Sequence, residues 1–375
     1  MAREFIHALP EHERDRQFDW LHRVHIDPLM LLLLLIVVGY GLLVLFSAVD
    51  QSETLLRAQL LRISLAFAAL LVAAQLPPRI YVRWAPFIYF FGVLLLVAVL
   101  MFGVTVKGSQ RWLDIAGIVR FQPSELMKIA VPMAVAWYFH DRPLPPSFKD
   151  VCVALAIVVV PAGFIIAQPD LGTGILVAGA GLAVLVLAGL PWRWVVYAFG
   201  ALIAAAPGLW YALQDYQRQR IITLFDPESD PLGAGWNIIQ STTAIGSGGV
   251  FGKGLLQGTQ SQLDFLPEAR TDFIIAVVGE ELGLVGVLAL LAVYVLIILR
   301  GLIMAMRAES TFGRLLSGAL VLTFFVYVFV NIAMVSGLLP VVGVPLPLVS
   351  YGGTSAITLM AGFGIIMAIR THKAW

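Results

Sequence analysis

The feature that most constrains this chain is the recurrence of apolar runs of membrane-spanning length along nearly the whole sequence. Each run is close to the ~20 residues that a helix needs to cross the bilayer core. Hydrophobic residues make up 60% of the chain and charged residues only 13%, about half the usual share in soluble domains. We therefore predict an all-α, polytopic integral membrane protein with about ten transmembrane helices. The runs fall near 28–48, 55–76, 80–102, 123–140, 150–167, 171–190, 194–213, 273–299, 315–336 and 353–371.

The order of these runs predicts the topology. Residues 1–27 are polar and do not have the pattern of a signal peptide, so we expect a cytoplasmic N-terminal tail followed by a single transmembrane domain over 28–371. Ten spans place both termini on one side, and most connecting arginines and lysines then fall on that side, which the positive-inside rule makes cytoplasmic. Extracytoplasmic loops are expected near 103–122, 214–272 and 337–352, the largest lying between spans 7 and 8. Loops of that length are more often functional than idle.

Several reaction classes are disfavoured by residue usage. Cys152 is the single cysteine, so an internal disulfide is impossible, and the sequence offers no cluster of Cys and His for a metal. All six histidines fall on the predicted cytoplasmic side, so a reaction on the outer side has no histidine base. The glycine-rich stretch 246–254 lacks the Walker A pattern, because Gly254 rather than Ser or Thr follows Lys253. We expect neither nucleotide nor nucleic-acid binding.

Asp272 ends the long outer loop, directly before the eighth apolar run. Its position favours a helix N-cap, because an aspartate there satisfies free N–H groups and suits the helix dipole. A carboxylate at a membrane mouth is also a candidate for acid–base chemistry on a membrane-bound substrate. The lack of histidine outside favours the second role.

Glu125 and Lys128 lie one helical turn apart at the start of the fourth run, so they share a face and can pair. An unpaired charge within the membrane costs at least a few kcal/mol. A structural ion pair and a substrate site are about equally favoured. Two further cations, Arg218 and Arg220, follow the seventh run outside; guanidinium groups suit phosphate oxygens, although lipid head groups are an alternative partner.

Two stretches of broken backbone also lie at membrane depth. Gln168-Pro-Asp-Leu-Gly172 separates the fifth and sixth runs, and Asp170 is placed to cap the sixth. The Pro- and Gly-interrupted stretch 341–355 precedes the last run. Irregular backbone at this depth requires cover by protein or a cavity, so we expect 341–355 to form a cavity wall near the outer surface.

Together these motifs resemble the SEDS family of cell-shape, division and sporulation proteins, in order and spacing, over nearly the whole chain after the tail. The short tails and Gly258-Thr-Gln-Ser-Gln262 are similar to the elongation branch of that family. The motifs that carry the resemblance are Arg111-Trp112-Leu113, Phe121-Gln-Pro-Ser-Glu125 with Lys128, Gln168-Pro-Asp-Leu-Gly172, Leu266-Pro-Glu268, Thr271-Asp-Phe273, Glu280-Glu-Leu-Gly283 and Pro345-Leu-Pro-Leu-Val-Ser-Tyr-Gly-Gly-Thr354.

The resemblance implies a peptidoglycan glycosyltransferase that polymerises lipid II at the outer face of the cytoplasmic membrane during elongation and maintenance of rod shape. It implies Asp272 as the catalytic acid–base group. Many members have His before Thr271, whereas this chain has Arg270. The implied partners are lipid II, the growing glycan strand, a class B penicillin-binding protein transpeptidase and membrane proteins of an elongation complex. A lipid-linked precursor flippase is the alternative function.

The candidate substrate-binding residues follow from these motifs. We hypothesise that the cations stabilise the lipid pyrophosphate. A divalent cation such as Mg²⁺ or Mn²⁺ could share that charge, although no ligand cluster in the sequence requires one. The candidates are Arg111, Trp112, Gln122, Ser124, Glu125, Lys128, Asp170, Arg218, Arg220 and Ser350.

Overall fold

The structure, a computed structural model, describes residues 24–49, 51–106, 109–115, 119–230, 233–262, 265–266 and 268–372. Most of the predicted tail, residues 1–23, lies outside the described residues. Each of the ten predicted runs is occupied by a helix. These helices are α2 (Pro28–Ala48), α3 (Glu53–Gln75), α4 (Pro78–Phe102), α5 (Pro123–Tyr138), α6 (Phe148–Ala167), α7 (Leu171–Leu187), α8 (Trp192–Ala212), α12 (Ile274–Met306), α13 (Thr311–Val335) and α14 (Thr354–Thr371).

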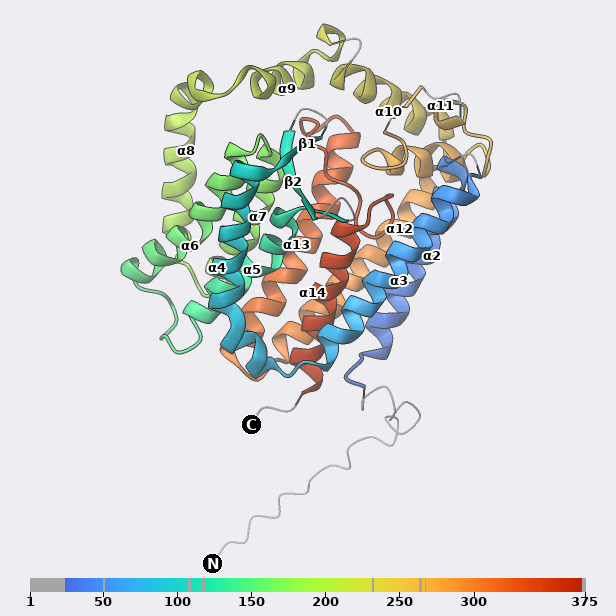
Figure 1. Ribbon diagram of the computed structural model, residues 1–375. Helices are drawn as coiled ribbons and strands as arrows, with labels where there is room; N and C mark the ends of the chain where they lie inside the picture. The colour runs from blue at the N-terminus through green and yellow to red at the C-terminus, as the bar shows by residue number, and fades with distance from the viewer. Residues whose placement is uncertain are drawn as a thin grey trace, which may run out of the picture.

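The helices form an upright bundle with the described ends of the chain at one end (Figure 1). Seven of the described helices are long and apolar enough to cross a membrane, which confirms a polytopic, largely helical membrane protein. The remaining three at predicted runs are α5, α7 and α8, and the number of ten spans stays a prediction. Helix α14 packs along α3, α5 packs along α4, and α13 contacts both α7 and α12. Helix α8 stands at the edge of the bundle, and most of its described side chains are exposed.

The loop near 103–122 adds a small sheet to this largely helical fold. It forms a small antiparallel sheet of β1 (Val104–Val106), β2 (Ser109–Ile115) and β3 (Val119–Phe121) in the order β1-β2-β3. Apolar and polar residues alternate along parts of these segments, which is the period of a half-buried strand and not of a helix. Leu113 pairs with Phe121, and that pairing brings the end of the sheet to the start of α5.

The long outer loop is mostly helical and lies across the bundle end opposite the described termini (Figure 1). It contains α9 (Asp215–Phe225), a 3₁₀ turn η2 (Pro227–Ser229), α10 (Ala234–Gly248) and α11 (Thr259–Gln262). Residues 235–245 belong to α10. Helix α10 packs against α12, so this loop is attached to the bundle.

Helix α12 contains a break at Gly283, whose φ of 65° and ψ of −164° are not helical. A side chain there is excluded, because a Cβ would lie 2.3 Å from the backbone nitrogen of Gly252. On each side of the break the helix exchanges backbone hydrogen bonds with the loop after α10: Lys253 N donates to Glu280 O, and Leu284 N donates to Gly249 O. The break therefore lets the loop backbone insert against the helix.

Candidate functional site

The centre of the site is a polar cavity of about 170 Å³ at the outer half of the bundle. Its walls come from β2, the start of α5, the start of α7, the middle of α13, and the segment that leads into α14. Among the predicted site residues, it brings together Arg111, Gln122, Glu125, Lys128 and Asp170. The other wall includes Gly343–Pro345 and Gly352–Ser355, which confirms the expectation of a cavity wall in 341–355.

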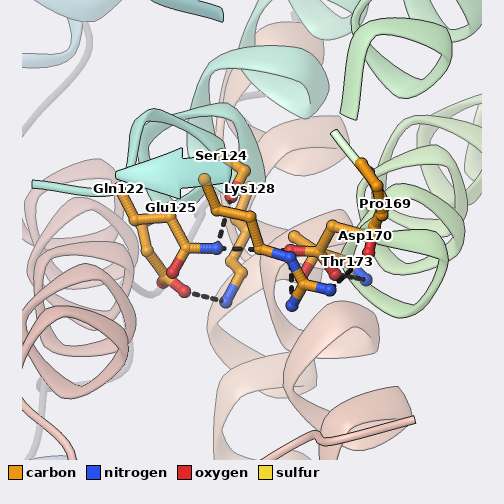
Figure 2. Close-up of polar contacts among 8 residues, drawn as sticks. Gln122, Ser124, Glu125, Lys128, Pro169, Asp170 and Thr173 are labelled. Atoms are coloured by element: carbon orange, nitrogen blue, oxygen red, sulfur yellow. Dashed lines mark hydrogen bonds and ion pairs between the residues drawn. The ribbon is translucent and has the colours of Figure 1, made fainter. Parts of the chain in front are cut away.

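Glu125 and Lys128 form the predicted ion pair, with Lys128 Nζ 2.7 Å from Glu125 Oε1 (Figure 2). Both side chains are less than one-tenth exposed, so the pair is formed away from bulk water. Lys128 also lies over the ring of Tyr327, 4.7 Å from its centroid, which adds a cation–π contact. Among the described residues, Glu125 Oε2 is buried without a hydrogen-bond partner. The pair is thus incompletely satisfied and lines a cavity.

Asp170 organises the opposite side of the cavity. Its Oδ1 accepts a hydrogen bond from Thr173 N at 3.2 Å, which confirms the predicted cap at the start of α7. Its Oδ2 accepts from Gln122 Nε2 at 3.3 Å and lies 3.5 Å from a guanidinium nitrogen of Arg111 (Figure 2). The Arg111 guanidinium also donates to Pro169 O. Asp170 therefore joins β2, α5 and α7 at one point.

Asp272 lies beside Gly343, one of the residues that line this cavity. A Cβ built on Gly343 would be 3.4 Å from Asp272 Oδ2, so the carboxylate rests against backbone that lines the cavity. The side chain of Asp272 is partly exposed. The capping prediction is wrong in detail, because Phe273 occupies the N-cap position of α12. Thr271 N and Phe273 N both donate to Glu268 O, and this turn delays the start of the helix by one residue.

The position of Asp272 is set by two polar side chains. Asn331 on α13 is fully buried, and its Nδ2 donates to both Asp272 O and Val344 O at 2.7 Å. Ser350, a predicted site residue, donates to Thr271 O and accepts from Leu346 N. These bonds join the 271–272 segment to the 344–350 wall, so Ser350 positions the site from outside the cavity.

A second polar cavity of about 250 Å³ lies beside the same segment. It is lined by Leu55, Glu268, Arg270, Thr271 and Tyr351. Tyr351 N donates to Arg270 O at 2.8 Å, and the 270–272 segment therefore runs between the two cavities. Asp272 is the carboxylate that this segment carries.

Arg218 binds the end of α8, whereas Arg220 interacts with charged residues of the site. The Arg218 guanidinium donates to Trp210 O and Tyr211 O, so it binds the last turn of α8, outside the cavity lining. Burial lowers the pKa of Arg220, the positive charge of Arg111 lowers that pKa further, and Asp170 and Asp272 oppose the decrease. The charges of Arg111, Asp170 and Asp272 therefore act on the Arg220 guanidinium.

The other two predicted residues do not line the first cavity. Ser124 is buried and accepts from Gln122 Nε2 at 2.9 Å, so it orients Gln122. Trp112 follows Arg111 along β2, and successive side chains of a strand point to opposite faces. Sequence reasoning missed Tyr327 and Asn331. Asn331 is a polar residue within an apolar span, and a polar residue at such a position indicates a functional site.

Glu125 and Asp170 line the first cavity, and Asp272 lies beside its lining residue Gly343. Glu125 is held by Lys128, and Asp170 by Arg111, Gln122 and Thr173. Within the part of the chain that the structure describes, no three His, Cys, Asp or Glu residues are grouped so as to hold a metal ion.

Comparisons with known proteins show the family of this chain. The model of the FtsW/RodA/SpoVE cell cycle protein family matches residues 27–374. The chain belongs to this family. It is 58% identical to the peptidoglycan glycosyltransferase MrdB of Escherichia coli K12 over 352 residues, covering 94% of this chain and 95% of that one. It is 34% identical to a probable peptidoglycan glycosyltransferase FtsW of Trichlorobacter lovleyi, with 92% of each chain covered.

Solved structures of FtsW/RodA/SpoVE proteins share the fold. A chain in a peptidoglycan synthase complex, described as coordinating polymerisation and crosslinking, aligns with a TM-score of 0.81 at 30% identity, covering 92% of this chain and 97% of that one. The rod-shape-determining protein RodA of Thermus thermophilus aligns with a TM-score of 0.70 at 27% identity, covering 92% and 96%. The arrangement of membrane helices is therefore that of RodA.

Proposed function

We propose that this chain is a peptidoglycan glycosyltransferase of the inner membrane that polymerises lipid II in cell elongation and the maintenance of rod shape. The observation that carries this proposal is the Asp272 carboxylate resting against Gly343, which lines the cavity that contains Lys128 and Arg111. A base beside a cavity with two cationic side chains suits transfer of a sugar from a pyrophosphate leaving group. The 58% identity to a peptidoglycan glycosyltransferase supports the same reaction.

In the proposed step, the 4-hydroxyl oxygen of the acceptor sugar attacks the anomeric carbon at the end of the growing chain. Asp272 takes the hydroxyl proton as the C–O glycosidic bond forms. The bond from the anomeric carbon to the phosphate oxygen breaks, and the lipid pyrophosphate leaves with the electron pair. Lys128, Arg111 and Arg220 stabilise its negative charge, and the first cavity is thus the pyrophosphate side of the reaction.

The second cavity, beside Thr271, is the proposed place of the acceptor sugar. It contains both signs of charge in Glu268 and Arg270, together with the aromatic ring of Tyr351, and such a mixture suits a neutral, hydroxyl-rich ligand. Asp272 then lies between the acceptor hydroxyl and the leaving group. We place the end of the bundle that carries the α9–α11 loop outside the cell, with both termini in the cytoplasm.

The packing below the first cavity favours polymerisation over lipid flipping. Tyr327, Phe324 and Phe363 are almost completely buried, and the last two rings pack with centroids 5.1 Å apart. A flippase needs a polar path to the other membrane face. These aromatic side chains and Lys128 line a cavity of only about 20 Å³, which leaves no open path for a lipid head group. A class B penicillin-binding protein and elongation-complex membrane proteins are the proposed partners, supported by the match to a peptidoglycan synthase complex.

The decisive experiment replaces Asp272 by asparagine, which keeps the volume and removes the base. Purified protein with its transpeptidase partner receives labelled lipid II, and glycan chains are resolved by gel electrophoresis. We expect at least a hundredfold loss of polymer. The matched control is Asp226→Asn, an exposed acid in the same loop, which should polymerise like the wild type. Wild-type polymerisation by Asp272→Asn would overturn the proposed role of this carboxylate.

A further inference from the structure

A cavity of about 340 Å³ lies at the bundle end that holds the described termini, away from the site described above. Four parts of the chain line it: the turn from α3 into α4, the residues after α5, the start of α13 and the end of α14. We call it the terminal-end cavity. Its lining residues are Pro77, Pro78, Arg79, Val82, Arg83, His140, Glu309, Ser310, Ile369 and His372.

Positive charge dominates the terminal-end cavity. Arg79 and Arg83 lie one turn apart on α4, where like charges repel each other. Among the described residues that line the cavity, Glu309 is the one carboxylate beside these two guanidinium groups. Within the described residues, Arg83 has no ion pair or hydrogen bond through its side chain, and the side chain is exposed. The cavity thus holds an excess of cationic groups.

The surrounding helices add to the positive potential. Helices α4 and α13 both begin at this cavity, with Pro78 at the first position of α4 and Ser310 capping α13 through a bond from Gly313 N. Free N–H groups and the helix dipole make such ends favourable for anions.

Two imidazoles complete the wall. His372 Nδ1 lies 3.0 Å from Ala368 O, and the ring stacks on His25 with centroids 3.5 Å apart, so its orientation is fixed. His140 Nδ1 is buried without a hydrogen-bond partner among the described residues. Both rings can donate to an anion when protonated.

The apolar part of the lining indicates how such an anion would arrive. Val82 and Ile369 line the cavity beside the charges, and the outer face of α4 continues into the bilayer with the exposed side chains of Trp84 and Phe87. Basic pockets between transmembrane helices at the cytoplasmic face bind the head groups of anionic phospholipids. We propose that the terminal-end cavity binds the phosphate of an anionic phospholipid, whose acyl chains lie along α4.

Native mass spectrometry of the full chain in a neutral detergent tests this proposal. We add phosphatidylglycerol, or phosphatidylcholine as the lipid without net charge, and compare wild type with Arg83→Gln. Arg307→Gln is the matched control, because Arg307 is an exposed arginine at the same end of the bundle that lies outside the cavity lining. We expect wild type and Arg307→Gln to retain phosphatidylglycerol over phosphatidylcholine, and Arg83→Gln to bind it about tenfold more weakly.

A parallel arm adds inorganic phosphate as competitor. If phosphate displaces the lipid only at concentrations far above those of the lipid, the phospholipid is the ligand. If phosphate alone protects the wild type from heat unfolding, and fails to protect Arg83→Gln, the same phosphate site takes the free anion. Equal retention of phosphatidylglycerol by wild type and Arg83→Gln, with no effect of phosphate, overturns the proposal. These readouts do not involve Asp272, so they are independent of the proposed function.

Discussion

Two carboxylate–lysine pairs in this protein have the same 2.7 Å separation between nitrogen and oxygen. They differ in how many other hydrogen bonds the carboxylate accepts. Glu125 and Lys128 line a cavity, and Glu125 Oε2 has no partner among the described residues. Glu280 is completely buried, and its Oε1 accepts from Lys253 Nζ, Thr259 N, Thr259 Oγ1 and Gln260 N.

This difference distinguishes an ion pair that can bind a ligand from an ion pair that only stabilises the fold. A carboxylate with all its hydrogen bonds made by its own chain has nothing left to offer a ligand. Glu280 therefore attaches the outer loop to α12. Glu125 and Lys128 line a cavity, and one oxygen of the Glu125 carboxylate has no hydrogen-bond partner among the described residues. Such a pair is suited to binding a ligand whose charge develops during a reaction.

The largest expected effect is that of Lys128→Met. We expect polymerisation to fall by at least a hundredfold, because a charge that stabilises the leaving group is lost. The protein should also become less stable, since breaking one side of a buried ion pair costs about 3–5 kcal/mol. Polymerisation of labelled lipid II and the melting temperature in detergent measure the two effects. Wild-type polymerisation would show that the two pairs are alike and both structural.

The double variant Glu125→Gln with Lys128→Met sharpens the comparison. Removing both charges leaves no uncompensated buried ion, so the melting temperature should return most of the way to that of the wild type. Polymerisation should stay as low as in Lys128→Met, because the leaving-group charge is still missing. Recovery of both quantities together would mean that the activity loss came from instability.

The smallest effect is expected for Lys253→Met. Glu280 keeps its bonds from Thr259 and Gln260, so the cost should be about 1–2 kcal/mol. We expect faster hydrogen exchange in residues 249–262 and a polymerisation rate within tenfold of the wild type. A loss as large as that of Lys128→Met would place the loop pair within the reaction as well.

The helices were predictable because long apolar runs allow few other structures in a membrane. The bond between Glu125 and Lys128 followed from their three-residue spacing, and the cap by Asp170 from its place before α7. These features depend on local geometry. The small sheet at 104–121 could not be predicted in this way, because β1 and β3 have only three residues each and so short an alternation does not distinguish a strand from a loop.

Other parts of the site depend on how distant segments meet. Arg218 and Arg220 are alike in sequence, yet the start of α9 turns Arg218 toward the end of α8 and brings Arg220 near Asp272. The joining of Asp272 O and Val344 O by Asn331 requires α13 to pass between two loops. The spacing of these residues in the sequence does not predict that contact.

The break at Gly283 separates a short first segment of α12 from the rest of the helix. Residues 274–282 form a segment about 13 Å long that is bonded to the loop through Lys253 N and Gly254 N, on one side of the break. Asp272 sits at the far end of this segment. The loop is also bonded to the other side of the break, because Leu284 N donates to Gly249 O and Val285 N to Val250 O. The loop thus bridges the break, and it holds the segment that leads to Asp272 in place against the rest of α12.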